Sequence, residues 1–359
     1  MRFVSPFLKR AVYPSLAMLG YLRRRSDAGP AIVTYHGILP RGYKTFDTDL
    51  DGGLVTAETF RRQLQLLKLQ YSVISPQDFR AWCEGKQELP SRAVLLTCDD
   101  DLRNTLTEMV PILQEHGLSC LFFVTGASLN EVPAMLWCEE LYLMLLAARG
   151  TVVLDLPQGE LARGNFVAQS VTVPEKRRLW WKLVKHLSGY NMPARRRLLE
   201  EVRAQLHLPD DWSTALLTDP LRHRFLMLNR VELSALVAAG MDVGAHTLTH
   251  PVLAQLSAEE AWCEISESRC RLEHVMGRPV WALAYPFGDA ASVTEREREM
   301  AERAGFTCAF VNSGGGLGAP MPRFALPRVH VTGAMNLGEF EAHVSGFYRS
   351  LRERFMGAS

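Results

Sequence analysis

Two segments of the chain hold side chains that could do chemistry together. Asp99, Asp100 and Asp101 directly follow the apolar run VLLTC, and His246 and His250 follow a second apolar run, MDVGA. Three adjacent carboxylates repel one another unless a cation or hydrogen bonds offset their charges. Two imidazoles and one carboxylate are a common ligand set for zinc, with one position left open for water. The alternative is a solvated acidic loop that also caps the next helix.

Strand and helix patterns alternate around these residues. Strand-like runs lie at 31–37, 71–75, 93–98, 119–126, 241–253, 280–289, 306–312 and 324–333, and helical patterns separate most of them. This alternation predicts repeated βα units in an α/β fold with a parallel sheet or barrel. In a β/α barrel the carboxyl ends of the strands meet on one face, so residues far apart in the sequence come together there.

A block of helical character interrupts the βα pattern and divides the chain. Residues 131–225 are interpreted as a largely helical insertion. The barrel is then assigned to residues 31–130 and 226–335, and residues 336–359 are predicted to form a C-terminal helix. Residues 1–30 form an N-terminal amphipathic segment, whose apolar stretch is too short to span a bilayer and lacks a cleavage site typical of a secretory signal.

Composition and charge bear on partners and location. The net charge is +1, with 40 basic and 39 acidic residues, so no nucleic-acid partner is expected from bulk charge. The seven cysteines are scattered, which fits a reducing compartment and predicts a cytoplasmic protein. The basic residues 1–25 either contact the inner membrane peripherally or pack on the domain as a helix.

Several segments, taken together, resemble the polysaccharide deacetylases, the NodB-homology family. TCDDDLRN looks like the TFDDG signature of that family, GAHTLTHPVL resembles its second motif, and AYPFGD resembles its third. VTYHGILP and ALPRVHVTG look like the opening and closing strands of a longer subgroup associated with exopolysaccharide and O-antigen clusters. The resemblance implies a distorted (β/α)7-type barrel. It also implies removal of acetyl groups from N-acetylated sugars of a bacterial polysaccharide or its lipid-linked precursor.

The resemblance implies a role for each charged residue of the motifs. Asp99 resembles the general base, and Asp100, His246 and His250 resemble the ligands of one divalent metal. Zinc is the first choice for this metal, with cobalt, nickel or manganese as alternatives. The metal would lower the pKa of a bound water, and Asp99 would accept its proton.

The residue that protonates the leaving amine is left open between His330 and His36. Arg328 shares a strand face with His330 by alternation, so it could instead orient Asp99 through a charge-assisted bond. A backbone N–H, that of Phe287 or a neighbour, is expected to stabilise the oxyanion. The expected substrate-binding residues are His36, Tyr285, Pro286, Phe287 and Gly288.

Asp101 departs from the family pattern, because it stands where the family has glycine. We expect its side chain to turn outward as a cap of the helix before Asn104. An Asp101 that turns inward would alter the metal site, and this possibility motivates the alternative of an inactive glycan-binding homologue. A sugar O-acetyl esterase is the other alternative, since amide and ester hydrolysis share one tetrahedral intermediate.

Overall fold

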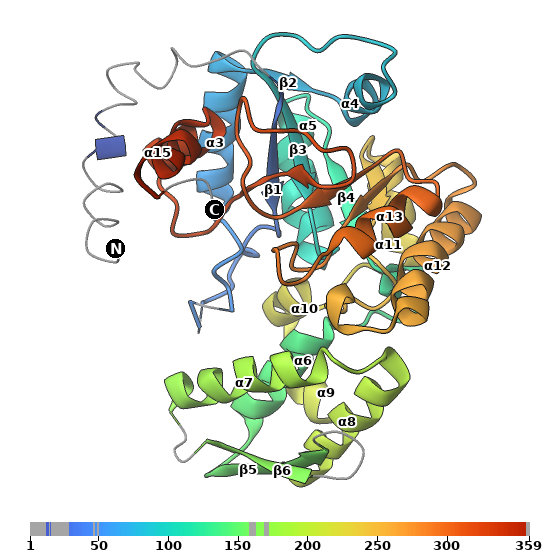
Figure 1. Cartoon of the computed structure of the whole chain (residues 1–359). Coiled ribbons are helices and arrows are strands. Elements are labelled where there is room, and N and C mark those ends of the chain that lie inside the picture. The colour runs from blue at the N-terminus through green and yellow to red at the C-terminus, as the bar shows by residue number, and fades with distance from the viewer. Residues whose placement is uncertain are drawn as a thin grey trace.

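The protein consists of a parallel barrel with a largely helical insertion at one end (Figure 1). The computed structural model describes residues 12, 13, 15, 29–45, 47, 48, 50–157, 163–168 and 172–356. The predicted membrane contact of residues 1–25 therefore falls almost entirely outside the described residues. Within the described part, no helix is both long enough and apolar enough to cross a membrane.

A nine-stranded sheet of parallel neighbours forms the barrel. Its strands are β1 (Ala31–Tyr35), β2 (Ser72–Ile74), β3 (Ala93–Cys98), β4 (Leu121–Val124), β7 (Asp242–Ala245), β8 (Ala282–Ala284), β9 (Cys308–Val311), β10 (Leu326–Pro327) and β11 (Val329–His330). The pairing order is β10-β9-β8-β7-β4-β3-β1-β11, and β2 also pairs with β3. Only Arg328 separates β10 from β11 in the chain, so the two ends of the sheet nearly close. The predicted β/α barrel is confirmed.

Helices connect the strands around the outside of the barrel. They are α3 (Ala57–Gln70), α4 (Pro76–Cys83), η3 (Thr105–Met109), α5 (Val110–Glu115), η4 (Gly126–Leu129), α11 (Arg230–Ala238), η5 (Leu253–Gln255), α12 (Ala258–Met276) and α13 (Glu295–Arg303). At the start of α12, the Ser257 hydroxyl accepts from the backbone N–H of Glu260, and the Glu260 carboxylate accepts from that of Ser257. This reciprocal cap satisfies N–H groups that lack partners inside the helix.

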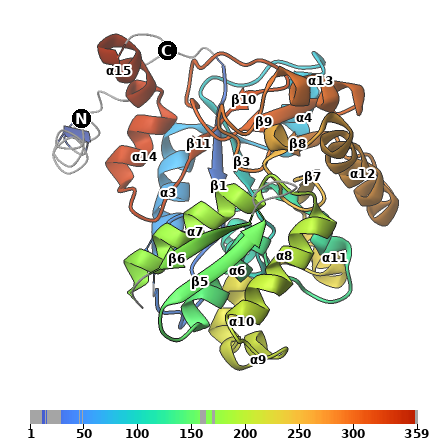
Figure 2. The ribbon, with the colours of Figure 1, turned by 60° about the horizontal axis from the view of Figure 1, so that its bottom comes forward.

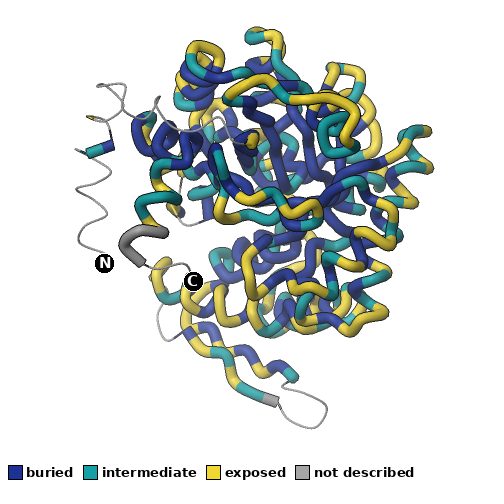
Figure 3. Tube along the Cα trace, turned by 45° about the horizontal axis from the view of Figure 1, so that its top comes forward, coloured by how far each residue is buried: buried dark blue, intermediate teal, exposed yellow. Residues whose placement is uncertain are grey.

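Strand alternation sorts the apolar side chains of the barrel into two cores. Ile32, Leu95 and Phe310 belong to the core inside the barrel. Val33 and Leu96, their neighbours along the strands, belong to the core between the strands and the surrounding helices. The strands β1, β3, β4 and β7 are buried along their whole length, and Figure 3 shows long buried stretches in the interior of the tube. The barrel is therefore a rigid support for whatever its strand ends carry.

The insertion has a core of its own. Its elements are α6 (Trp137–Ala147), β5 (Val152–Pro157), β6 (Arg163–Ala168), α7 (Val173–Leu187), α8 (Met192–Gln205), α9 (Trp212–Leu216) and α10 (Asp219–Phe225). The ring of Trp180 on α7 lies 4.9 Å from that of Tyr142 on α6, measured between centroids, and both side chains are buried. Figure 2 shows α7, α8 and the β5–β6 hairpin in front of the barrel once the insertion is turned forward.

The C-terminal segment contains two helices, which corrects the prediction of a single one. They are α14 (Leu337–Val344) and α15 (Phe347–Met356). Gly346 between them has φ 73, in the left-handed region. A Cβ added there would lie 2.3 Å from the carbonyl oxygen of Leu317, so this close contact requires glycine and the helix breaks there.

Candidate active site

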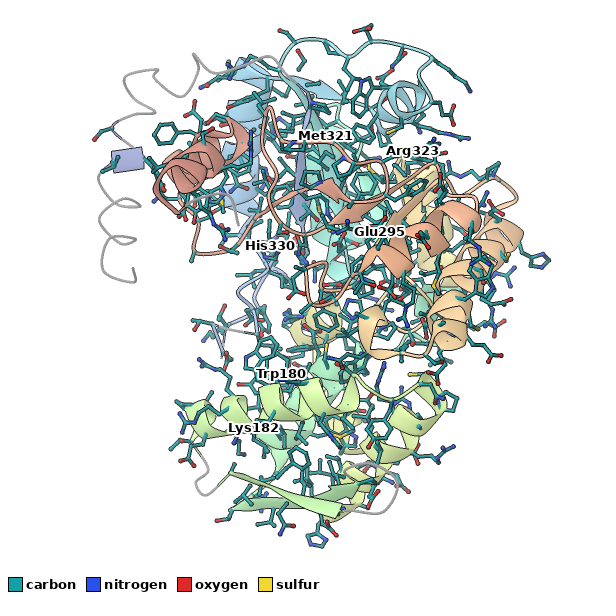
Figure 4. The ribbon with its side chains drawn as sticks, viewed as in Figure 1. Trp180, Lys182, Glu295, Met321, Arg323 and His330 are labelled. Carbon is teal, nitrogen blue, oxygen red and sulfur yellow. The ribbon has the colours of Figure 1, made fainter. Side chains whose placement is uncertain are left out.

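The polar residues predicted from the sequence gather at the carboxyl ends of the barrel strands. Residues 99–101 follow β3, His246 follows β7, Tyr285 follows β8, and His330 ends β11. Figure 4 labels His330 at the edge of the barrel that faces the insertion, with Trp180 of α7 on the other side of this junction. The insertion therefore borders the face on which a β/α barrel carries its chemistry.

Asp100, His246 and His250 form one cluster that could hold a metal ion. Their ligand atoms all lie within 4.8 Å of one another. Oδ1 of Asp100 lies 3.4 Å from Nε2 of His246 and 3.2 Å from Nε2 of His250. Asp100 and His250 have φ of 73 and 55, and this left-handed backbone is uncommon for residues other than glycine. The structure thus brings together all three predicted ligands.

Hydrogen bonding fixes the tautomer of His246. Its Nδ1 lies 2.8 Å from the carbonyl oxygen of Ala284. Because a carbonyl oxygen only accepts, Nδ1 carries a proton, and Nε2 is the nitrogen that faces Asp100: it donates to the carboxylate when the ring is protonated and offers a lone pair to a cation when the ring is neutral. This is the tautomer that a metal ligand needs.

The cluster attracts positive charge. Burial lowers the pKa of His246, but the hydrogen bond and charge of Asp100, together with the charge of Asp99, outweigh burial and raise the pKa. Burial raises the pKa of Asp100, but hydrogen bonds from His246 and His250 outweigh it and hold the pKa well below its ordinary value. Burial lowers the pKa of His250. An ionised carboxylate beside two imidazoles is a suitable donor set for a divalent cation.

Asp99 forms a buried, bidentate ion pair with Arg328. Nη1 and Nη2 of Arg328 lie 2.7 and 2.5 Å from Oδ1 and Oδ2 of Asp99. Nη1 also donates to the hydroxyls of Thr34 and Thr97 at 3.1 and 3.4 Å. Burial raises the pKa of Asp99, but the charge and hydrogen bonds of Arg328, together with the charges of His246 and His36, outweigh burial, so the pKa falls below its ordinary value. Arg328, at the seam between β10 and β11, therefore keeps Asp99 ionised.

The prediction that Asp101 turns outward and caps a helix is wrong. Its side chain is buried, and its carboxylate accepts from the N–H and hydroxyl of Thr125, both at 3.3 Å, and from the hydroxyl of Ser128. Positive φ at both Asp100 and Asp101 turns this carboxylate toward η4, while Asn104 makes no side-chain cap. Burial raises the pKa of Asp101 to about 7.

His330 and His36, the two candidate proton donors, lie side by side. Their ring centroids are 4.7 Å apart. Nδ2 of Asn312 donates to Nδ1 of His330 at 2.8 Å, so the neutral His330 ring carries its hydrogen on Nε2. Burial, with the nearby His36 and Arg328, lowers the pKa of His330 to about 3. His330 is therefore a neutral imidazole at neutral pH.

Fewer side chains of the third motif face the site than predicted. The Tyr285 hydroxyl donates to the carbonyl of Phe324 at 3.1 Å, and its ring belongs to the core between strands and helices. The prediction that Tyr285 binds substrate is therefore wrong, because the residue after an inward-facing Ala284 faces outward. The ring of Phe287 packs 5.1 Å from that of His250, measured between centroids.

Gly288 holds the third motif against the neighbouring strand end. The backbone N–H of Asn312 donates to its carbonyl at 2.8 Å, and its φ is 65. A Cβ added there would lie 2.6 Å from the Asn312 nitrogen, so glycine is required. Pro286 is buried in the same turn and accepts from the N–H of Gly288 at 2.7 Å.

Two residues near the site were not predicted from the sequence. Asn312, which orients His330, directly follows β9, and polar residues at strand ends were the signal that found the others. Trp137 of the insertion donates from Nε1 to the carbonyl of His250 at 3.0 Å. No sequence pattern identifies Trp137, because this contact depends on how the insertion docks on the barrel.

Comparison with known proteins finds one family likeness in the sequence. Residues 174–309 match the family model described as polysaccharide deacetylase. This range of the chain is therefore similar to that family. The matched range includes His246, His250 and the third motif, while the aspartates after β3 precede it. No curated protein sequence matches the chain.

Solved deacetylase structures share the fold. The Streptococcus pyogenes deacetylase PplD in complex with acetate matches with a TM-score of 0.54 at 16% identity, over 89% of this chain and 99% of that one. IcaB from Ammonifex degensii matches with a TM-score of 0.53 at 16% identity, over 90% of this chain and 98% of that one. These likenesses show a common nearly closed barrel with flanking helices.

Proposed function

We propose that this protein is a metal-dependent polysaccharide deacetylase that removes the acetyl group from an N-acetylated sugar of a bacterial polysaccharide or its lipid-linked precursor. One observation carries the proposal: the convergence of Asp100, His246 and His250 directly beside the ionised Asp99. The donor set fits one divalent ion, zinc first and cobalt, nickel or manganese as alternatives. When bound, the ion supplies a water of lowered pKa and polarises the acetyl carbonyl.

Asp99 is the base in this proposal. Its pair with Arg328 keeps it ionised, so it can take the proton of the water that attacks the acetyl carbon. The bidentate bond also fixes the orientation of the carboxylate, because both oxygens are held. Arg328 does not meet the reacting atoms in this account and acts as a positioning residue.

His330 is our choice for the group that protonates the leaving amine, with His36 as the alternative. His330 presents Nε2–H, because Asn312 occupies its Nδ1. The ring is neutral in the free protein, since its pKa is lowered to about 3. Negative charge that develops on the acetyl oxygen raises the pKa of a neighbouring imidazole, so His330 takes up a proton from solvent on Nδ1, with the Asn312 amide turned to accept from it. The imidazolium then gives its Nε2 proton to the nitrogen as the carbon–nitrogen bond breaks, and the ring returns to its neutral form.

The backbone N–H of Phe287 is our choice for the oxyanion. The next N–H in the turn, that of Gly288, is already bonded to the carbonyl of Pro286. The ring of Phe287 rests against His250, so the turn lies beside the metal cluster. A fixed backbone donor beside the cation stabilises the charge that develops on the acetyl oxygen.

The alternative of an inactive homologue was motivated by an Asp101 that turns inward and alters the metal site. Asp101 does turn inward. Its carboxylate, however, bonds to Thr125 and Ser128, and Asp100 is the aspartate grouped with the two histidines.

Acetate release tests the proposed function. The purified protein is expected to release acetate from an N-acetylglucosamine oligosaccharide, and Asp99→Asn is expected to lower kcat by about 10²- to 10⁴-fold with the bound metal retained. Asp219→Asn, at an exposed aspartate of the insertion, is the matched control and should leave kcat unchanged. Acetate release by Asp99→Asn at the wild-type rate would contradict the proposal. An O-acetylated oligosaccharide in parallel separates amide from ester hydrolysis.

We also propose a cytoplasmic location, peripheral at the inner membrane through residues 1–25. Seven free cysteines support the first part, since thiols persist in a reducing compartment. Deletion of residues 1–25 is expected to abolish co-sedimentation with membranes, and unchanged co-sedimentation would contradict the membrane contact.

A further inference from the structure

A cavity lies between the barrel and the insertion, directly beside the metal ligand His250. Its volume is about 260 Å³. The barrel contributes residues 125–127 and 248–250 to its wall, the insertion contributes 134–137 and Arg196, and α12 contributes Arg271. Trp137 of the insertion donates from Nε1 to the carbonyl of His250, so a hydrogen bond joins the insertion to the barrel at this cavity. A ligand here would lie next to the proposed catalytic metal without occupying its ligands.

The charged residues of the cavity are arginines. Arg196 and Arg271 are among the described residues that line it, and none of these described residues is acidic. A second cavity adjoins the first at Arg196 and does include an acid, Glu140. Both arginines have glutamate partners outside this lining, so what the cavity offers to an anionic ligand is their remaining N–H donors.

Each arginine is held by only one edge of its guanidinium. Arg196 donates from Nη1 to the two oxygens of Glu140 at 2.9 and 3.2 Å. Arg271 donates from Nε to Glu267 at 3.3 Å. These acids orient the two guanidinium groups and leave further N–H donors on each. Free donors in a fixed plane suit the bidentate recognition of a carboxylate or phosphate.

The rest of the wall is mostly apolar and includes three methionines. They are Met135, Met192 and Met227. Methionine side chains adapt to irregular shapes, so they suit the apolar face of a sugar ring better than they suit a small, highly hydrated ion. The lining therefore combines an adaptable apolar surface with two cationic groups.

We propose that this cavity is a subsite for a sugar residue that carries an anionic group, a carboxylate or a phosphate, next to the sugar that loses its acetyl group. The inference rests on the proposed function and narrows its substrate class to acidic glycans. Arg196 and Arg271 are then specificity residues, which bind the flanking sugar and do not touch the reacting atoms.

Matched acidic and neutral substrates test this subsite. A hyaluronan tetrasaccharide, in which glucuronate alternates with N-acetylglucosamine, is compared with fully N-acetylated chitotetraose, and N-acetylated chitobiose 1-phosphate, which carries its phosphate on the neighbouring sugar, provides the phosphate arm. We expect the wild-type protein to have a lower KM for an acidic probe than for chitotetraose. Arg271→Gln and Arg196→Gln are each expected to raise the ratio of acidic to neutral KM about 10-fold. Arg61→Gln, at an exposed arginine paired with Glu115 on α3 and α5, is the control and should leave the ratio unchanged.

Binding measurements separate this inference from the proposed function. Calorimetry of the Asp99→Asn protein with the same probes needs no hydrolysis. Tighter binding of an acidic probe that Arg271→Gln abolishes supports the subsite, even if no probe loses acetate. Acetate release with equal KM for all probes, unaltered by either arginine substitution, overturns the subsite and leaves the proposed function standing. Arg271 is exposed, so its substitution keeps the test valid if Arg196→Gln fails to fold.

Discussion

At the scale of single residues, the candidate site depends on charges buried beside their partners. Asp99 is buried, and an isolated carboxylate there would take up a proton rather than stay ionised. The Arg328 pair offsets this cost. Strand alternation in the sequence predicted that Arg328 could reach Asp99. The direction of Asp101 could not be predicted, because it depends on positive φ at two successive residues.

Removing the Arg328 charge is expected to move the acid limb of the activity profile. Arg328 holds the pKa of Asp99 down, so the base form persists to low pH in the wild type. In Arg328→Gln the pKa of Asp99 rises, so the loss of kcat on acidification should begin at a higher pH than in the wild type. In Arg328→Lys this acid limb should shift by a smaller amount. The pair also contributes stability that is present above the ordinary Asp pKa and is lost as pH falls through the lowered value. An identical acid limb in all three proteins would contradict this role.

Substitution of the two histidines distinguishes the proposed proton donor from its neighbour. His330→Ala is expected to lower kcat by about 10²-fold or more, because general acid catalysis contributes that much. His36→Ala should lower kcat by a smaller factor. Asn312→Ala should also lower kcat, because the Asn312 side chain fixes the tautomer of His330. Steady-state kinetics on one acetylated oligosaccharide checks all three. A larger loss in His36→Ala than in His330→Ala would reverse the assignment.

At the scale of elements, the strand ends were predictable and the docking of the insertion was not. Apolar runs followed by Asp99, His246 and Tyr285 indicated which strand ends could meet. Tyr285 was expected to bind substrate, and its outward direction is seen only in the structure, where Ala284 before it faces inward. The hydrophobic periodicity of the sequence does not predict that Arg224 of the insertion contacts the loop after β1. Such contacts join segments far apart in sequence and depend on tertiary packing alone.

Arg224 is expected to carry much of the docking of the insertion. It is buried and contacts Asp51 from Nε at 2.7 Å and Glu139 from Nη2 at 2.9 Å. Arg224→Met leaves both carboxylates without this cation, which should cost about 3–5 kcal/mol in the free energy of unfolding. Arg61→Ala, which breaks an exposed pair, should cost about 0–1 kcal/mol. Urea unfolding measures both, and equal losses would show that Arg224 has no such role.

At the scale of the whole molecule, the proposed metal joins parts of the barrel that are distant in the chain. Asp100 follows β3, and His246 and His250 follow β7, with β4 lying between these strands in the sheet. The insertion then reaches the same place through Trp137 and His250. The barrel and the insertion thus meet at one cluster. Binding of a metal there is expected to stabilise both parts of the molecule.

Metal removal is therefore expected to lower the thermal stability. A ligand that binds only the folded state stabilises it in proportion to the logarithm of its concentration over Kd. Chelation should lower Tm, and added zinc should restore it. In His246→Ala, the same additions should leave Tm almost unchanged. If neither the chelator nor added zinc changed the Tm of the wild-type protein, this would argue against a bound metal.

Hydrolysis by this protein is proposed to require one divalent metal held by Asp100, His246 and His250. The most direct test of this requirement is a titration of zinc into the chelator-treated protein, with acetate release from an N-acetylglucosamine oligosaccharide measured at each point. We predict that the rate rises from near zero and levels off at one zinc per chain, and that His250→Ala shows no such rise. Full acetate release by the metal-free protein, or an unchanged titration in His250→Ala, would contradict the account.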